Sequence, residues 1–196
     1  WAAQPSELQA FVQAAQIQYA QGYAGAYRAW CEDKNGNCVA ELLVRPNGMN
    51  VPDPYALLRV DMVSNLNGKF EAARYEPDLR AAGSPKTVRF SSRLAVTLTP
   101  IVWSRVEFLC HPKPTDLSQL TQWANRWIDP TDSKPPSKSG FSGVIHSITY
   151  PATKAGRSRI LVNFGSSGPE AFHELLQALE ATGVQNVQVQ SSIQVQ

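Results

Sequence analysis

Two cysteines, Cys31 and Cys38, stand at either end of a loop rich in turn-forming residues, and three kinds of chemistry could use them. The pair could form a disulfide, stay as two free buried thiols, or bind a metal. Structural zinc sites usually space paired ligands about two to four residues apart, whereas six residues separate these two cysteines. Asn35-Gly36 within the loop favours a tight turn. We therefore predict a hairpin in which Cys31 and Cys38 face each other and form a disulfide.

The other candidates for catalysis are Cys110 and the histidines His111, His146 and His173. Cys110 could act as a nucleophile if folding brings a histidine beside it, and Cys110 with His111 could supply metal ligands. The sequence contains no nucleophile elbow, phosphate-binding loop, dinucleotide-binding glycine motif or HExxH helix. We expect a protein that is not an enzyme and that has no cofactor and no metal. A small Cys/His enzyme is the alternative.

Basic residues gather between positions 134 and 159 with no acid among them. The expected order of elements places Lys154 and Arg157 with His111 and Lys113 at one end of the sheet. It places Lys134 and Lys138 at the other end, with the turn of residues 165–168. Free backbone N–H groups at the start of a helix, as expected after that turn, favour anions. We predict that an acidic ligand or partner surface binds to His111, Lys113, Lys154, Arg157, Arg159, Ser166 and Ser167. The alternative is a solvated loop that lysines keep soluble.

Nucleic acid is disfavoured as a partner. The formal net charge of +2 is too small for a general polyanion binder. RNA-binding domains built on a four-stranded sheet display aromatic residues on the central strands, in a Lys/Arg-Gly-aromatic context. The strand expected over residues 159–164 lacks that context.

Three stretches have the apolar spacing and end signals of amphipathic helices. They cover residues 6–22, 115–130 and 167–183. In the third, Ser167 and Glu170 fit a capping box around Pro169, and Gly183 suits the left-handed position after the last turn. A fourth helix is expected over residues 53–66, with a strand over 57–63 as the alternative.

Runs of β-branched and aromatic residues between turn signals predict nine strands. Their ranges are 26–31, 38–44, 70–75, 87–90, 94–99, 101–110, 142–150, 159–164 and 184–190. The fold class is therefore α+β, with an N-terminal helix and an antiparallel meander over residues 1–100. Residues 101–196 follow the order strand, helix, strand, strand, helix, strand of a ferredoxin-like βαββαβ half. We expect the two parts to pack as one unit.

The last strand alternates Val187 and Val189 with glutamines, and the alternation resumes at Ile193 and Val195. We predict that this terminal strand is a sheet edge to which a partner adds a strand. The functional hypothesis is a non-enzymatic protein-interaction or assembly module that binds a protein partner or assembles with itself. A domain that binds anions or nucleic acid through its basic loop ends is a further alternative.

The compartment follows from the cysteines and the composition. Only 17% of the residues are charged, against about 25% in typical globular proteins, and a disulfide requires an oxidising environment. We expect an extracytoplasmic protein, secreted, periplasmic or particle-associated. No apolar run approaches the roughly 20 residues that a membrane span needs.

Overall fold

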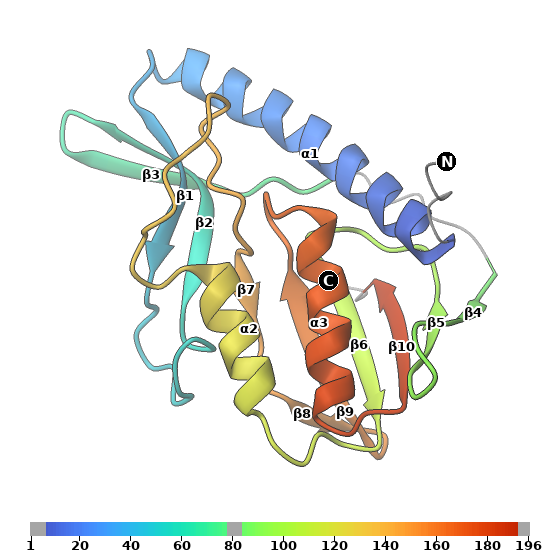
Figure 1. The fold of residues 1–196 in the computed structure, drawn as a ribbon. Helices are drawn as coiled ribbons and strands as arrows, with labels where there is room; N and C mark the ends of the chain where they lie inside the picture. Colours follow the sequence, from blue (N-terminus) through green and yellow to red (C-terminus); the bar gives the residue numbers. More distant parts are fainter. Residues whose placement is uncertain (1–6, 78–83, 192–196) are drawn as a thin grey trace.

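The computed structural model describes residues 7–77 and 84–191, which form a mixed α and β fold with three helices and one mostly antiparallel ten-stranded sheet. Figure 1 shows α2 and α3 side by side over one face of the sheet, with the longer α1 running past one end of α3. In chain order the elements are α1 (Glu7–Asp33), β1 (Cys38–Val44), β2 (Leu58–Leu66), β3 (Lys69–Ala73), β4 (Lys86–Arg89), β5 (Ala95–Leu98), β6 (Val106–His111), α2 (Ser118–Ile128), β7 (Ser147–Ile148), β8 (Ala152–Lys154), β9 (Arg157–Asn163), α3 (Pro169–Ala181) and β10 (Asn186–Ser191).

The first helix is longer than the sequence predicts. We expected it to end near Gly22 and a strand to follow over residues 26–31, but α1 continues to Asp33. Gly22 is used for close packing inside the helix, because a Cβ at this position would lie 1.9 Å from the hydroxyl oxygen of Tyr75. The face of α1 that packs on the core also continues past Gly22 at helical spacing, through Leu8, Val12, Tyr19, Tyr23, Tyr27 and Trp30.

The helix expected over residues 53–66 is also wrong, and β2 occupies most of that range. Both faces of the strand are covered from Asp61 to Ser64, so the buried residues there do not alternate with exposed ones. One edge of β2 pairs with β1. The other edge is shared, because Leu58 pairs with Ser147 of β7 whereas the stretch from Met62 onward pairs with β3. We call this divergence of β3 and β7 along one edge of β2 the sheet fork.

Strands from both halves of the chain belong to the one sheet. Within the second half the order is β7-β9-β6-β10, and each neighbouring pair is antiparallel. The first half extends this group on both sides, with β2 beside β7 and β5 beside β10. The β5–β10 pair is parallel.

The terminal strand is not a sheet edge, which corrects the prediction for Val187 and Val189. β10 lies between β6 and β5, where Val187 pairs with Cys110 on one side and with Val96 on the other. Val187 and Val189 are buried, so neither is available to a partner strand. Ile193 and Val195 lie outside the described residues.

The strand predicted over residues 142–150 is wrong in length, because only the two residues of β7 form a strand in that range. Backbone N–H groups that precede β7 bond to side chains. The Ser142 N–H donates to Oε2 of Glu41, and the N–H groups of Gly143 and Val144 donate to Oγ of Ser166. These donors are therefore used outside the sheet.

The helices α2 and α3 pack together over an aromatic core. Nε1 of Trp123 donates to the backbone oxygen of Ala171 across 2.9 Å, and the predicted core face of α3 is buried. Gly183 has φ +88°, as predicted for the residue that ends this helix. The predicted capping box is wrong, because Gly168 is the N-cap and the Ser167 hydroxyl donates to the Phe164 oxygen instead.

Candidate functional site

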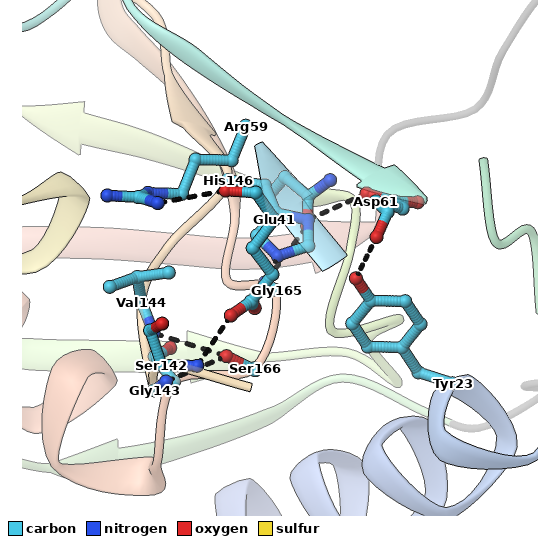
Figure 2. Close-up of polar contacts among 12 residues, drawn as sticks. Tyr23, Glu41, Arg59, Asp61, Ser142, Gly143, Val144, His146, Gly165 and Ser166 are labelled. Atoms are coloured by element: carbon cyan, nitrogen blue, oxygen red, sulfur yellow. Dashed lines mark hydrogen bonds and ion pairs between the residues drawn. The ribbon is translucent and has the colours of Figure 1, made fainter. Parts of the chain in front are cut away.

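A histidine is buried between two carboxylates where β1, β2 and the chain just before β7 meet. Nδ1 of His146 lies 2.7 Å from Oδ1 of Asp61, and Nε2 lies 2.8 Å from Oε1 of Glu41 (Figure 2). The exposed fraction is 1% for the side chains of His146 and Glu41 and 3% for that of Asp61. We call these three residues the His146 cluster.

The strand pairing brings the two carboxylates of this cluster together. Ala40 pairs with Met62 and Leu42 pairs with Val60, so Glu41 and Asp61 stand opposite each other on β1 and β2. Like charges at opposite positions destabilise a pair of strands. The imidazole between the two carboxylates offsets this repulsion. Glu41 also has φ +58°, a conformation uncommon outside glycine that the surrounding structure must hold in place.

Backbone groups and a tyrosine complete the hydrogen bonding of the His146 cluster. The second oxygen of Glu41 accepts from the Ser142 N–H, and the second oxygen of Asp61 accepts from the Tyr75 N–H, each across 2.7 Å. The Tyr23 hydroxyl, from α1, donates to the backbone oxygen of Asp61 across 2.6 Å (Figure 2). All four carboxylate oxygens therefore have a partner, as buried charges require.

The two carboxylates decide the protonation of His146. Burial alone would lower the pKa of the imidazole, but the hydrogen bonds and negative charges of Asp61 and Glu41 outweigh it and raise the pKa. Both ring nitrogens face carboxylate oxygens, and only the imidazolium can donate from both. Burial, reinforced by the same carboxylates, also raises the pKa of the Tyr23 hydroxyl, which stays protonated.

A glycine and a backbone hydrogen bond hold the imidazole in place. A Cβ on Gly165 would lie 2.0 Å from Cδ2 of His146, so a side chain there would occupy the space of the ring. The Arg59 N–H donates to the backbone oxygen of His146 across 2.7 Å, which ties the residue to β2.

Arg59 forms a second buried set of contacts beside the cluster. Its guanidinium donates to the backbone oxygens of Glu41, Ile128 and Asp129 and to Oδ1 of Asp132. Its side chain is only 1% exposed. Arg59 therefore fixes the chain after α2 against β1 and β2.

The His146 cluster joins parts of the sheet, and its hydrogen-bonding groups are already occupied. The imidazole is buried and both of its nitrogens are occupied, so it has no free position from which to exchange a proton with a bound molecule. We interpret the cluster as a charged connection between the β1–β2 pair and the chain entering β7. Sequence reasoning considered His146 but missed Glu41, Asp61 and Arg59. The available signal was an isolated charge within an apolar run, as in CVAELLV and LLRVDMV.

The predicted basic residues at the end of β6 and around the β8–β9 turn partly come together. Nζ of Lys113 donates to the hydroxyl of Thr153 beside Lys154, and His111 and Arg157 line one shallow hollow of about 310 Å³. Arg157 also donates to the side-chain oxygen of Gln188.

Two of these predicted residues share one acid, which offsets one of their two positive charges. Lys154 lies 3.1 Å from Oε1 of Glu107, and Arg159 pairs with the same oxygen. Burial opposes ionisation of Glu107, but hydrogen bonds from Arg159, Gln190 and Lys154 outweigh it and lower the pKa of the carboxyl. The positive charge of this group is therefore smaller than the sequence indicates.

The two predicted serines have structural partners at the turn before α3. Oγ of Ser166 accepts from two backbone N–H groups, as described above, and Ser167 is fully buried with its hydroxyl bonded to Phe164. Within the described residues, neither serine side chain has a hydrogen bond to any of the five predicted basic residues.

The cysteines adopt a pairing with a different geometry from the predicted hairpin. Cys31 and Cys38 form a disulfide with a Cα–Cα distance of 5.4 Å, which confirms the bond, but it joins the last turn of α1 to the first residue of β1. Cys110 is fully buried, and burial raises the pKa of its thiol to about 12. At neutral pH this thiol is protonated and out of reach of solvent, unlike a catalytic cysteine.

Across residues 7–77 and 84–191, no group of three or more His, Cys, Asp or Glu side chains is arranged to hold a metal ion. None of the helices in these ranges has the length and hydropathy for a bilayer span. Comparisons of the chain with protein-family models, curated protein sequences and solved structures found no match.

Proposed function

We propose that the chain is a non-enzymatic protein-interaction module that binds an extended segment of a partner protein along the free edge of β1. In this mode the partner's backbone continues the hydrogen-bond ladder of the sheet, and pockets for alternate side chains give specificity. Strand addition thus takes place at β1, which is the first strand in the order of the sheet, and not at the interior strand β10.

The observation that carries the proposal is the absence of exposed charge on β1. Sheet edges normally carry charged residues that oppose pairing with other chains. Among the described strands with a free edge, β3 has Lys69 and Glu71, β4 has Lys86 and Arg89, and β8 has Lys154. The sequence of β1 is CVAELLV, and its one charged residue, Glu41, is turned inward to His146.

Exposed aliphatic side chains on β1 favour the same interpretation. Val39 is 51% exposed and Leu42 is 41% exposed. Among the described strands β1 pairs only with β2. Side chains bond to its backbone at two residues, because Tyr27 hydrogen-bonds to Ala40 and Arg59 donates to the oxygen of Glu41, so the stretch open to a partner strand runs from Leu42 to Val44. An apolar strand with an unpaired edge is a template for another strand.

The edge is also held rigid, which reduces the entropy lost on binding. The disulfide fixes the first residue of β1 to α1, and the hydrogen bonds of Glu41 fix the centre of the strand.

We also propose a fold type and a location for the chain. The order β7-β9-β6-β10, with α2 and α3 on one face, supports a ferredoxin-like core to which β1–β3 and β4–β5 are added. The disulfide supports an extracytoplasmic location.

The test is a selection of binders from a random peptide library, followed by calorimetry with variants of the protein. Val39→Lys places a charge on the edge, and Ile17→Lys is the matched control because Ile17 is a similarly exposed aliphatic residue, 44%, on α1. We expect Val39→Lys to weaken binding of the selected peptide by about tenfold or more and Ile17→Lys to leave it unchanged. Methylation of alternate backbone nitrogens of the peptide should abolish binding.

Hydrogen exchange identifies the surface that is used. Bound peptide should slow exchange of those β1 amides that do not pair with β2. A peptide that protects another surface, or that binds the Val39→Lys protein as tightly as the wild type, would refute the proposal. A library that yields no binder to the wild-type protein would also refute it.

A further inference from the structure

The sheet fork encloses a cleft of about 590 Å³ between β2 and β3 on one side and β7 and β9 on the other. Sites for small molecules usually fall between about 300 and 1,000 Å³ and combine apolar walls with a few polar groups. This cleft therefore has the size of a ligand site. It lies along the second edge of β2, away from the β1 edge discussed above.

Two arginines without partners line the cleft. Arg74 follows β3 and is exposed, and Arg105 immediately precedes β6 and is half-buried. Within the described residues, neither guanidinium has a hydrogen bond or an ion pair to another side chain. Several other cations near strands of this sheet have one: Lys34, Lys69, Lys86 and Lys154 each pair with a glutamate.

No carboxylate in the cleft is free to neutralise these arginines. Asp61 is the one acid among the described residues of the lining, and His146 and the Tyr75 N–H occupy its two oxygens. Arg59 also lines the cleft, but its guanidinium is bonded to the chain around Asp129 and Asp132. The charge that remains unpaired in the cleft is therefore positive.

Neutral donors and apolar walls define the rest of the ligand's chemistry. The hydroxyls of Ser104 and Ser147 have no partner among the described residues, and the side-chain oxygen of Asn163 accepts from the Gly165 N–H. The apolar lining consists of Leu58, Val60, Ala72, Ala73, Leu161 and Val162. A guanidinium binds carboxylate and phosphate groups through paired, charge-assisted hydrogen bonds.

We infer that the sheet fork is a binding site for an organic anion whose carboxylate or phosphate head group binds Arg74 and Arg105 and whose short apolar body contacts the aliphatic walls. Such a ligand uses both features of the cleft, whereas inorganic phosphate uses only the arginines and a neutral alcohol only the walls. The site does not depend on a partner strand at β1.

Isothermal titration with four probes tests this inference: octanoate, octyl phosphate, octanol and inorganic phosphate. At least one of the two octyl anions should bind more tightly than octanol and inorganic phosphate, with an affinity that falls as salt is added. Arg74→Gln and Arg105→Gln should each weaken that binding by about tenfold. Arg28→Gln is the matched control, because Arg28 is an exposed arginine on α1 that bonds only within its own helix. Both cleft arginines lack partners in the described part of the chain, so the variants should keep the wild-type thermal unfolding temperature.

A second arm separates two sources of the same head group. If the wild-type protein sediments with phosphatidylglycerol vesicles and the Arg74→Gln/Arg105→Gln protein does not, the natural ligand is a lipid. If the wild-type protein binds only the soluble anions, the natural ligand is a free small molecule. The inference is wrong if octanol binds as tightly as octanoate and octyl phosphate, if the double variant binds them like the wild type, or if neither octyl anion binds.

Discussion

Replacing His146 should change how the stability of the protein depends on pH. The folded protein raises the pKa of this imidazole above its ordinary value of 6.5. A group with a raised folded pKa contributes stability that is complete below the unfolded pKa and is lost as pH rises through the folded pKa. We therefore expect the free energy of unfolding to fall as pH rises above 6.5.

The size of the effect follows from one retained proton. Where the folded state holds one proton more than the unfolded state, stability falls by about 1.4 kcal/mol per pH unit. Between pH 6.5 and 8.0 the loss is at most about 1.6 kcal/mol, because the unfolded imidazole is itself half protonated at the start of that interval. His173 opposes this loss by at most about 0.4 kcal/mol, because its pKa is lowered in the folded protein and the unfolded imidazole still holds part of a proton just above pH 6.5. This contribution is the same in the wild type and in His146→Gln.

The assay is urea unfolding followed by tryptophan fluorescence without reductant, at several pH values in this interval. His146→Gln should remove the fall in stability, and His111→Gln, which changes an exposed histidine, should keep it. His146→Gln should also cost about 3 to 5 kcal/mol, because it leaves two opposed carboxylates without their cation. An equal slope in the wild type and in His146→Gln would refute the reasoning. If the variant does not fold, an NMR titration of the wild-type imidazole decides, and a midpoint below 6.5 would be the refuting result.

Two further predictions concern the covalent and steric supports of β1 and His146. Replacing Cys31 and Cys38 by serine should lower the free energy of unfolding by about 2 to 3 kcal/mol, because the bond closes a loop between residues seven apart and restricts the unfolded chain. Urea unfolding measures this change, and a loss below about 0.5 kcal/mol would contradict the prediction. Gly165→Ala should displace the His146 ring and destabilise the protein by more than Gly156→Ala does. Both glycines have positive φ, but only at Gly165 would the added Cβ lie within 4 Å of a neighbouring atom. Equal losses in urea unfolding, with unchanged imidazole NMR signals, would show that this contact does not hold the ring.

Local sequence patterns predicted the elements of the second half well. The core faces of α2 and α3 and most strands after residue 86 match their expected ranges, because each element there has its own periodicity and end signals. The end of α1 was predicted wrongly at Gly22. A glycine that allows close approach of Tyr75 looks the same in sequence as a glycine that ends a helix.

The neighbours of each strand could not be predicted in the same way. The sequence shows that residues 184–190 alternate as a strand, but not that β5, from the first half of the chain, covers one of its edges. The His146 cluster has the same difficulty, since Glu41 and Asp61 lie 105 and 85 residues before His146. The side chains of such a cluster become visible in sequence only as isolated charges within apolar strands.

The buried charges also explain why β1 has no exposed charge and why the sheet fork has no free carboxylate. Glu41 would protect the edge of β1 if it faced solvent, but its positive φ and its bond to His146 turn it inward. Asp61 would neutralise the arginines of the cleft if it were free, but the same imidazole binds it. One buried histidine therefore withdraws one negative charge from the β1 edge and another from the cleft. We therefore expect loss of the imidazole to alter the β1 edge and the sheet fork together, although the two surfaces lie on opposite sides of the β1–β2 pair.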